Sequence, residues 1–179
     1  IEDGDLKIIN QKLDWWGLNY YKPERVFDDA DRKGDFPWTL EAPPVSDVKT
    51  DIGWEIYAPG LKLSVEDLYR RYELPECYIT ENGACDNTDV IDGEVDDTMR
   101  LDYVSDHLEI VAGLIKDGYP LRGYFAWSLM DNFEWAEGYR MRFGLVHVDY
   151  ETQVRTVKKS GKWYRELAAK FPKGNHKPG

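Results

Sequence analysis

The chain has 179 residues and carries 34 acidic side chains against 23 basic ones, a formal net charge of −11. This length allows one domain with a buried core, and the negative field argues against nucleic acid and anionic lipid as partners. The field suits a neutral or cationic ligand better than a phosphorylated one. Seven Trp and twelve Tyr residues supply flat faces with polar tips, which suit polyhydroxylated ligands, although we expect most of them in the core.

The sequence offers few residues for disulfides or metals. Cys77 and Cys85 are the only cysteines, and their separation along an extended segment argues against a bridge, so we expect free thiols in a reducing, cytoplasmic compartment. The three histidines form no spaced cluster with cysteine or acid, so no metal or other cofactor is expected. No apolar run approaches the roughly 20 residues of a membrane span, and the acidic start does not resemble a signal peptide. The initial Ile1 suggests that the chain does not begin at a natural translation start.

The first predicted elements are a short helical turn in IEDGDLKIINQ and a strand over residues 14–21, DWWGLNYY. The strand is aromatic and apolar, as expected of a strand covered on both faces. Gly17, Asn19 and Tyr21 share one side, and the bulky side chains share the other. This pattern indicates a barrel strand with Asn19 and Tyr21 inward at its carboxyl end. A sandwich strand with two hydrogen-bonded core polar residues is the alternative.

Residues 22–60 follow as a long Pro- and Asp-rich connection without a clear helical or strand period. Trp38 and the aromatic group around Trp54 indicate that at least its second half is ordered. The next helix is predicted to begin near Ser64, which resembles the first residue of a capping box, and to end before Pro75.

The stretch CYITENGA, residues 77–84, predicts a short strand that ends in an Asn-Gly turn. Side chains alternate across a strand, so Glu81 is expected on the face of Cys77 and Ile79, as the last residue on that face. In a parallel sheet or barrel, the carboxyl ends of the strands carry the chemistry. The alternative is an ordinary Glu81 in water at a strand end.

The clearest helix is predicted to start at Asp97 or Thr98 and to stop at Gly118. Its apolar residues recur at three- and four-residue steps and predict a stripe that faces the core. The residues of this stripe are Leu101, Val104, Leu108, Val111 and Ile115.

The segment LRGYFAWSL predicts a third strand, over residues 122–129, with Gly123, Phe125 and Trp127 on one face. The loop that follows it carries Glu134 and Trp135.

The last part of the chain predicts a hairpin that turns at residues 151–153 and a helix that Thr156 caps. The apolar residues of this helix, from Trp163 to Phe171, are expected to face inward. Residues 172–179 are expected to form a frayed tail.

Strands and helices alternate along the chain, which favours an α/β fold with parallel strands and helices outside. Three strand–helix units cannot close a barrel, so the sheet is either small and open or part of something larger. Each predicted strand places a polar or aromatic side chain at its carboxyl end. A carboxylate that attacks a sugar needs a phenol, an indole and a second carboxylate around it, and side chains of these types are present. These groups are Asn19, Tyr21, Glu81 and Trp127, with Glu134 and Trp135 just beyond.

Three separated stretches, DWWGLNYY, ITENG and GYFAWSLMDNFEWAEGYRMRFGLVHVDYET, closely resemble glycoside hydrolase family 1, the β-glucosidase family. The resemblance covers residues 14–171. It implies a (β/α)8 TIM barrel, of which residues 1–171 supply the last three βα units, from the sixth strand to the final helix. It also implies a retaining β-glucosidase that hydrolyses terminal non-reducing β-D-glucosyl residues, as in cellobiose, by double displacement.

The same resemblance implies a role for each site residue. Glu81 is the nucleophile, and Tyr21 orients it. The residues implied around the sugar are Asn19, which lines the site, Trp127, which floors the −1 subsite, Glu134 and Trp135, which bind hydroxyls, Phe143, which closes the pocket, and Trp54, which walls the leaving-group side. In this family the Trp127–Ser128 peptide bond is cis.

The sequence departs from the family because its acid/base motif, Thr-x-Asn-Glu-Pro, is absent. A retaining glycosidase needs two carboxyls about 5–5.5 Å apart, so the chain is expected to be an inactive carboxyl-terminal fragment. Its unpaired strands are expected to join a complementary amino-terminal fragment or to self-associate. In that barrel Cys77 and Ile79 would face the interior.

Two functions stay open at this point. The chain is either part of a β-glucosidase or a non-catalytic sugar-binding or scaffold protein that kept the aromatic pocket and lost the acid. The retained Glu81 beside Tyr21 favours the first. Trp135 and the acidic field favour a β-glucoside or β-fucoside, with some β-galactoside tolerance, over a 6-phosphorylated glycoside.

Overall fold

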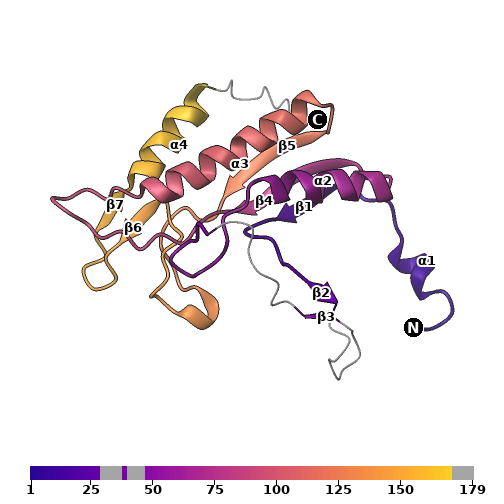
Figure 1. Ribbon diagram of the computed structural model, residues 1–179, viewed down its shortest axis with the longest axis horizontal. Helices are drawn as coiled ribbons and strands as arrows, with labels where there is room; N and C mark the ends of the chain where they lie inside the picture. The colour runs from indigo at the N-terminus through magenta and orange to yellow at the C-terminus, as the bar shows by residue number, and fades with distance from the viewer. Residues whose placement is uncertain (29–37, 40–46, 171–179) are drawn as a thin grey trace.

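The computed structural model describes residues 1–28, 38–39 and 47–170. The predicted tail, and Phe171 before it, lie outside these residues. The alternation of strands with helices is the predicted one (Figure 1). In chain order the elements are α1 (Asp5–Ile9), β1 (Trp15–Asn19), β2 (Phe27–Asp28), β3 (Trp38–Thr39), α2 (Pro59–Arg71), β4 (Glu76–Asn82), α3 (Thr98–Lys116), β5 (Leu121–Ala126), the 3-10 helix η1 (Trp135–Glu137), β6 (Val146–Val148), β7 (Arg155–Val157) and α4 (Lys159–Lys170).

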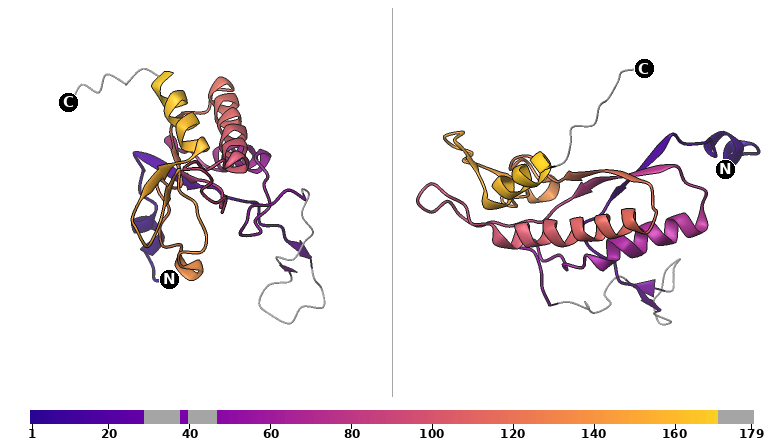
Figure 2. Two further views of the ribbon diagram at one scale, coloured as in Figure 1. Left: turned by 90° about the vertical axis from the view of Figure 1, so that its left-hand side faces the viewer. Right: turned by 90° about the horizontal axis from the view of Figure 1, so that it is seen from above.

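The central feature is a parallel sheet in the order β1-β4-β5, which confirms the predicted parallel arrangement. Helices α2 and α3 lie along one face of this sheet, and α4 packs against α3 (Figures 1 and 2). Within the described residues β1 and β5 each pair with one neighbour, so both are edge strands. The structure contains one chain, and the expected association of these edges with a second chain or segment stays a prediction.

The main core lies between this sheet and the helices. Cys77 and Ile79 of β4 are fully buried there, in one cluster with Leu61 and Val65 of α2 and Leu114 of α3. The prediction that Cys77 and Ile79 face a barrel interior is therefore wrong. Alternate side chains of a strand point to opposite faces, and these two occupy the face that the helices cover.

The opposite face of the sheet is aromatic and is left open by the helices. Trp15 and Phe125 are 55% and 57% exposed on it. The Trp15 ring meets the Tyr78 ring edge-on, with 5.6 Å between centroids. A Cβ on Gly17 would lie 2.7 Å from the Thr80 methyl, so only glycine leaves room for Thr80 on the neighbouring strand.

The predicted start of α2 is wrong, whereas the predicted bounds of α3 are confirmed. Helix α2 begins at Pro59, because the fixed φ of proline suits a first helical position. Ser64 lies inside the helix, where its hydroxyl donates to the Gly60 carbonyl at 2.9 Å. Helix α3 has Asp97 at its N-cap position, and Gly118 follows its end with a φ of 96°.

The predicted hairpin is confirmed by the antiparallel pairing of β6 with β7. The predicted cap of the last helix is wrong, since Thr156 lies in β7 and α4 begins at Lys159. The carboxylate of Asp97, distant in sequence, accepts from the Ser160 amide at 2.8 Å and so satisfies a donor of the first turn. Local spacing contains no sign of such a cap.

Residues 47–60 of the predicted connection are ordered, as expected of the part around Trp54, and residues 40–46 lie outside the described residues. Lys49 and Glu55 form an antiparallel bridge, and the Glu55 carboxylate accepts two hydrogen bonds from Arg25, each at 2.9 Å. These contacts hold the segment that carries Trp54 against the start of the connection.

Candidate active site

A β-bulge at the end of β4 orients Glu81. Leu18 pairs with Ile79 and Asn19 pairs with Glu81, so Thr80 and Glu81 together oppose Asn19. The extra residue interrupts the alternation and brings Glu81 to the open face. The prediction that Glu81 shares the face of Ile79 is therefore wrong, although its position at the carboxyl end of a strand is confirmed.

The Glu81 carboxylate accepts a hydrogen bond from the Tyr21 hydroxyl at 2.7 Å. Burial, together with this bond and the negative charge of Glu81, raises the pKa of Tyr21 far above its ordinary value. The phenol therefore stays protonated and donates to the carboxylate. Asn19 lies beside this pair, and its side-chain carbonyl accepts from the Thr80 hydroxyl at 2.7 Å.

Aromatic rings form one wall next to the carboxylate. The Tyr21 ring lies 5.6 Å from Trp54 and 6.2 Å from Phe143, and Trp54 and Phe143 lie 5.8 Å apart. Phe143 is 1% exposed, and Tyr21 and Trp54 are half-buried. These three rings come from distant parts of the chain, and the structure brings them together as a single apolar surface.

Trp127 and Glu134 lie in the segment after β5. The Trp127–Ser128 peptide bond is cis, as predicted. Burial raises the pKa of Glu134, a hydrogen bond from the Trp127 side chain opposes this shift, and the charge of Glu81 adds to it. Two half-buried carboxylates therefore influence each other across the site.

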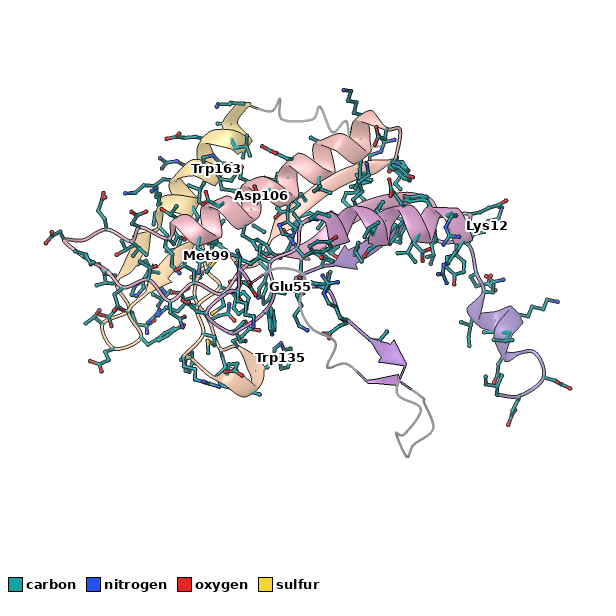
Figure 3. The ribbon with its side chains drawn as sticks, viewed as in Figure 1. Lys12, Glu55, Met99, Asp106, Trp135 and Trp163 are labelled. Atoms are coloured by element: carbon teal, nitrogen blue, oxygen red, sulfur yellow. The ribbon has the colours of Figure 1, made fainter. Side chains whose placement is uncertain are left out.

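Trp135 lies apart from this cluster. It begins η1 with a φ of 43°, and its side chain is 83% exposed at the end of the loop after β5 (Figure 3). The other residues predicted for the site form a continuous set of contacts or electrostatic neighbours, whereas Trp135 faces solvent.

Sequence reasoning missed two buried polar residues behind the site, Asn82 and Tyr103. The sequence predicts Asn82 in a turn, but it is the last residue of β4 and is fully buried. Tyr103 lies on α3, whose buried side includes Arg100 and His107, each separated from Tyr103 by a helical step. The three- and four-residue spacing of these polar residues could have indicated a second buried side of the helix. The apolar stripe was the stronger pattern, so this second pattern was not used.

The part of the chain that the structure describes contains no group of three or more His, Cys, Asp or Glu residues that could hold a metal ion. In the same residues, no helix is long and apolar enough to cross a membrane. Cys77 and Cys85 are buried free thiols, as predicted.

This arrangement fits chemistry by a carboxylate. Tyr21 donates a hydrogen bond to Glu81 as a neutral partner, and Glu134 lies within electrostatic reach. An ionised carboxylate beside an aromatic wall can attack an electrophilic carbon or accept hydroxyl protons from a bound polyol.

Comparison with known proteins agrees with this chemistry. A sequence model of glycosyl hydrolase family 1 matches residues 1–172. The β-glucosidase of Agrobacterium sp. (strain ATCC 21400) is 73% identical over 176 residues, which are 98% of this chain and 38% of that protein. β-Glucosidase A of Thermotoga maritima is 46% identical over 164 residues, or 91% of this chain and 36% of that protein.

Solved structures give the same result. The complex of virulence factor SghA with its substrate analog salicin superposes with a TM-score of 0.93 at 72% identity, over 97% of this chain and 38% of that one. A T. maritima family 1 glycoside hydrolase, complexed with a cyclophellitol analogue transition state mimic, superposes with a TM-score of 0.85 at 44% identity. The superposition covers 92% of this chain and 36% of that one. The chain spans under two-fifths of the length of these relatives, about 38% of the first. The chain therefore belongs to glycosyl hydrolase family 1 and corresponds to part of its TIM barrel.

Proposed function

We propose that this chain is the carboxyl-terminal portion of a retaining β-glucosidase, with Glu81 as nucleophile. The observation that supports this most is the 2.7 Å hydrogen bond from Tyr21 to Glu81 at the carboxyl ends of parallel strands. A carboxylate that only stabilised the fold would be expected to have a cationic partner. Glu81 has a neutral phenol, which orients the carboxylate and leaves its charge available for attack.

The proposed reaction has two displacement steps. In the first, Glu81 attacks the anomeric carbon, the bond to the aglycone oxygen breaks, and that oxygen takes a proton from a carboxylic acid outside this chain. In the second, the same group removes a proton from water, which attacks the anomeric carbon and releases Glu81. The sequence contains no Asn-Glu-Pro, so the acid/base is assigned to the remaining part of the protein.

The remaining site residues are assigned to the substrate. We assign the −1 sugar to a subsite that Trp127 would floor, with Glu134 binding its hydroxyls and Asn19 lining the site. Phe143 would close this pocket, and Trp54 would form the wall toward the leaving group. We also assign Trp135 to a sugar hydroxyl, because it follows Glu134 directly in the chain, although its side chain is exposed in this structure.

A β-glucoside is the proposed substrate, with a β-fucoside as a close alternative and some tolerance of β-galactosides. SghA was solved with salicin as a substrate analog, and two close relatives are β-glucosidases. A further relative, 46% identical over 183 residues, is a bifunctional β-D-glucosidase/β-D-fucosidase from Bifidobacterium breve. The net charge of −11 argues against a 6-phosphorylated glycoside.

The chain is proposed to supply the sixth, seventh and eighth strands of the barrel, through β1, β4 and β5 of this structure. The open sheet face and the two edge strands support this, because Trp15 and Phe125 would gain cover inside a closed barrel. Alone, the chain is expected to lack activity and to pair with an amino-terminal portion or with itself. The buried free thiols of Cys77 and Cys85 support a cytoplasmic location.

The test is a chimaeric enzyme in which this chain replaces the matching portion of the 73% identical Agrobacterium β-glucosidase. We expect hydrolysis of an aryl β-glucoside with retention of the anomeric configuration. NMR of the released sugar measures this configuration. Glu81→Ala should abolish this turnover, and added azide should restore aglycone release with an α-glucosyl azide as product. Glu76→Ala, an exposed glutamate at the other end of β4, is the control and should remain active.

Two results would contradict the proposal. A Glu81→Ala chimaera with near-normal turnover would remove Glu81 from the reaction. An inactive but folded chimaera that binds glucosides, measured by calorimetry, would favour the non-catalytic sugar-binding protein instead. Faster turnover of a 6-phosphoglucoside than of the plain glucoside would overturn the substrate assignment alone.

A further inference from the structure

Behind the site, the Asn82 side chain lies where the ends of β1, β4 and β5 meet, and it is fully buried. Its Nδ2 donates to the Tyr20 carbonyl at 2.6 Å and to the Tyr103 hydroxyl at 3.0 Å. Its Oδ1 accepts from the Tyr124 hydroxyl at 2.5 Å. Because the Tyr20 carbonyl can only accept, the orientation of the amide is fixed by its partners.

The same network reaches the backbone of the site residues. The Tyr103 hydroxyl donates to the Tyr21 carbonyl at 2.8 Å. The backbone carbonyl of Asn82 accepts from the backbone amide of Trp127 at 2.9 Å. Glu81 precedes Asn82 directly, so Glu81, Tyr21 and Trp127 are all attached to one buried group.

The hydrogen bonds run in one direction, from Tyr124 to Asn82, from Asn82 to Tyr103, and from Tyr103 to the Tyr21 carbonyl. Each hydroxyl donates once, and both protons of the Asn82 amide are used. An aspartate at position 82 would lack both donors, and a phenylalanine at position 103 would leave the Tyr21 carbonyl without this bond. A side chain that only filled space would not need this directed set.

We propose that Asn82 and Tyr103 are positioning residues that hold the Glu81 carboxylate at its working distance from Tyr21 and from the sugar. Neither side chain touches the substrate, since both lie on the helix side of the sheet, where Tyr103 packs against Ala84 and Val104. The inference rests on the proposed function, because it assigns Glu81 a reaction that needs such alignment.

The experiment uses Tyr103→Phe in the chimaeric enzyme, because this change removes one hydroxyl and keeps the ring. Tyr164→Phe is the matched control: its hydroxyl also donates to a backbone carbonyl of the sheet, that of Tyr124 at 3.3 Å, but not near residues 20–21. The measurement is the rate at which an activated 2-deoxy-2-fluoro-β-glucoside labels Glu81, read by intact mass. A leaving group that needs no proton isolates nucleophilic attack from the acid.

We expect Tyr103→Phe to lower the labelling rate constant of the folded enzyme about tenfold, with little change in the inhibitor concentration at half-saturation. Tyr164→Phe should stay within about twofold of the parent. Asn82→Asp, a second variant of nearly the same shape, should lower the rate constant in the same way. The fraction of folded enzyme is measured by near-UV circular dichroism, and each rate constant is calculated per folded molecule.

Equal labelling rate constants for Tyr103→Phe and Tyr164→Phe would overturn this inference alone, as would a loss due entirely to the unfolded fraction. A parent chimaera that is folded but not labelled at Glu81 would overturn the proposed function, and the inference with it. A specific loss in Tyr103→Phe and Asn82→Asp, with Tyr164→Phe unaffected, supports the positioning role.

Discussion

The molecule contains two polar regions near the carboxyl ends of its strands, and they handle charge in opposite ways. One is a buried ion cluster, formed by Asp97, Arg100, Asp131, Arg142 and Lys158, in which Arg100 pairs with Asp97. The Asp131 carboxylate lies 2.7 Å from the Arg142 guanidinium and 2.9 Å from the Lys158 ammonium. The other region is the site, and among the described residues neither Glu81 nor Glu134 belongs to an ion pair.

The difference separates charges that hold the fold from charges that are available for chemistry. In the buried ion cluster, the Asp131 carboxylate also accepts from the Gly144 amide at 2.9 Å, so its oxygens are occupied. Each charge there is compensated, and removal of one partner leaves the other buried alone. In the site, Tyr21 donates to Glu81 without cancelling its charge, which is the condition for a nucleophile.

The largest expected effect is on the stability of the buried ion cluster. Asp131→Asn in the chimaeric enzyme should lower the free energy of unfolding by about 3–5 kcal/mol, because it leaves Lys158, which is fully buried, without its carboxylate. Glu81→Gln should not lower it, since the change removes one of two carboxylates that repel each other. Urea unfolding followed by tryptophan fluorescence measures both. Equal losses in the two variants would remove the distinction between the regions.

Glu134 tests whether a carboxylate of the site affects activity rather than stability, in contrast to Asp131 of the buried ion cluster. Glu134→Gln in the chimaeric enzyme should lower kcat/KM for an aryl β-glucoside about 100-fold, because the sugar hydroxyls lose a charged carboxylate as their hydrogen-bond acceptor. Its unfolding midpoint should stay at the parent value. Glu137→Gln is the control, because Glu137 is a half-buried glutamate of the same loop that pairs with Arg140. A matching loss of kcat/KM there would show that the effect is not specific to Glu134.

His107 is a third case, a fully buried ring whose Nε2 has no hydrogen-bond partner within the described part of the chain. Burial lowers its pKa from 6.5 to about 4, so between these values the unfolded chain binds more protons. Stability should therefore fall as the pH drops below 6.5, by about 2 kcal/mol at pH 5. Comparison of unfolding between pH 7 and pH 5 measures this loss. His107→Gln should reduce it, and an unchanged pH dependence in that variant would assign the loss to other groups.

The smallest effect is expected at the surface. The exposed Arg122 guanidinium lies 2.7 Å from the Glu76 carboxylate. Water and salt screen such a pair, so Arg122→Ala should leave the unfolding midpoint within experimental error. Thermal unfolding at low and high salt measures this, and a clear salt-dependent loss would mean that exposed pairs also stabilise this fold.

Much of the fold could be predicted from the sequence because local patterns encode it. Apolar, β-branched runs ended by turn residues gave the central strands, and Asp97 and Gly118 gave the bounds of α3. The pairing of Tyr21 with Glu81 followed from the resemblance to a family, not from spacing, since residues 60 positions apart share no local signal. The cis bond after Trp127 had the same origin.

Long-range contacts determined the rest. The bulge that brings Glu81 to the open face depends on how β4 pairs with β1, so strict alternation along β4 gave the wrong face. The cap of α4 comes from Asp97, at the start of another helix. Helix α3 buries Arg100 and Tyr103 because partners elsewhere in the chain satisfy their polar atoms. A sequence records which groups can donate or accept, but only the folded chain decides which of them meet.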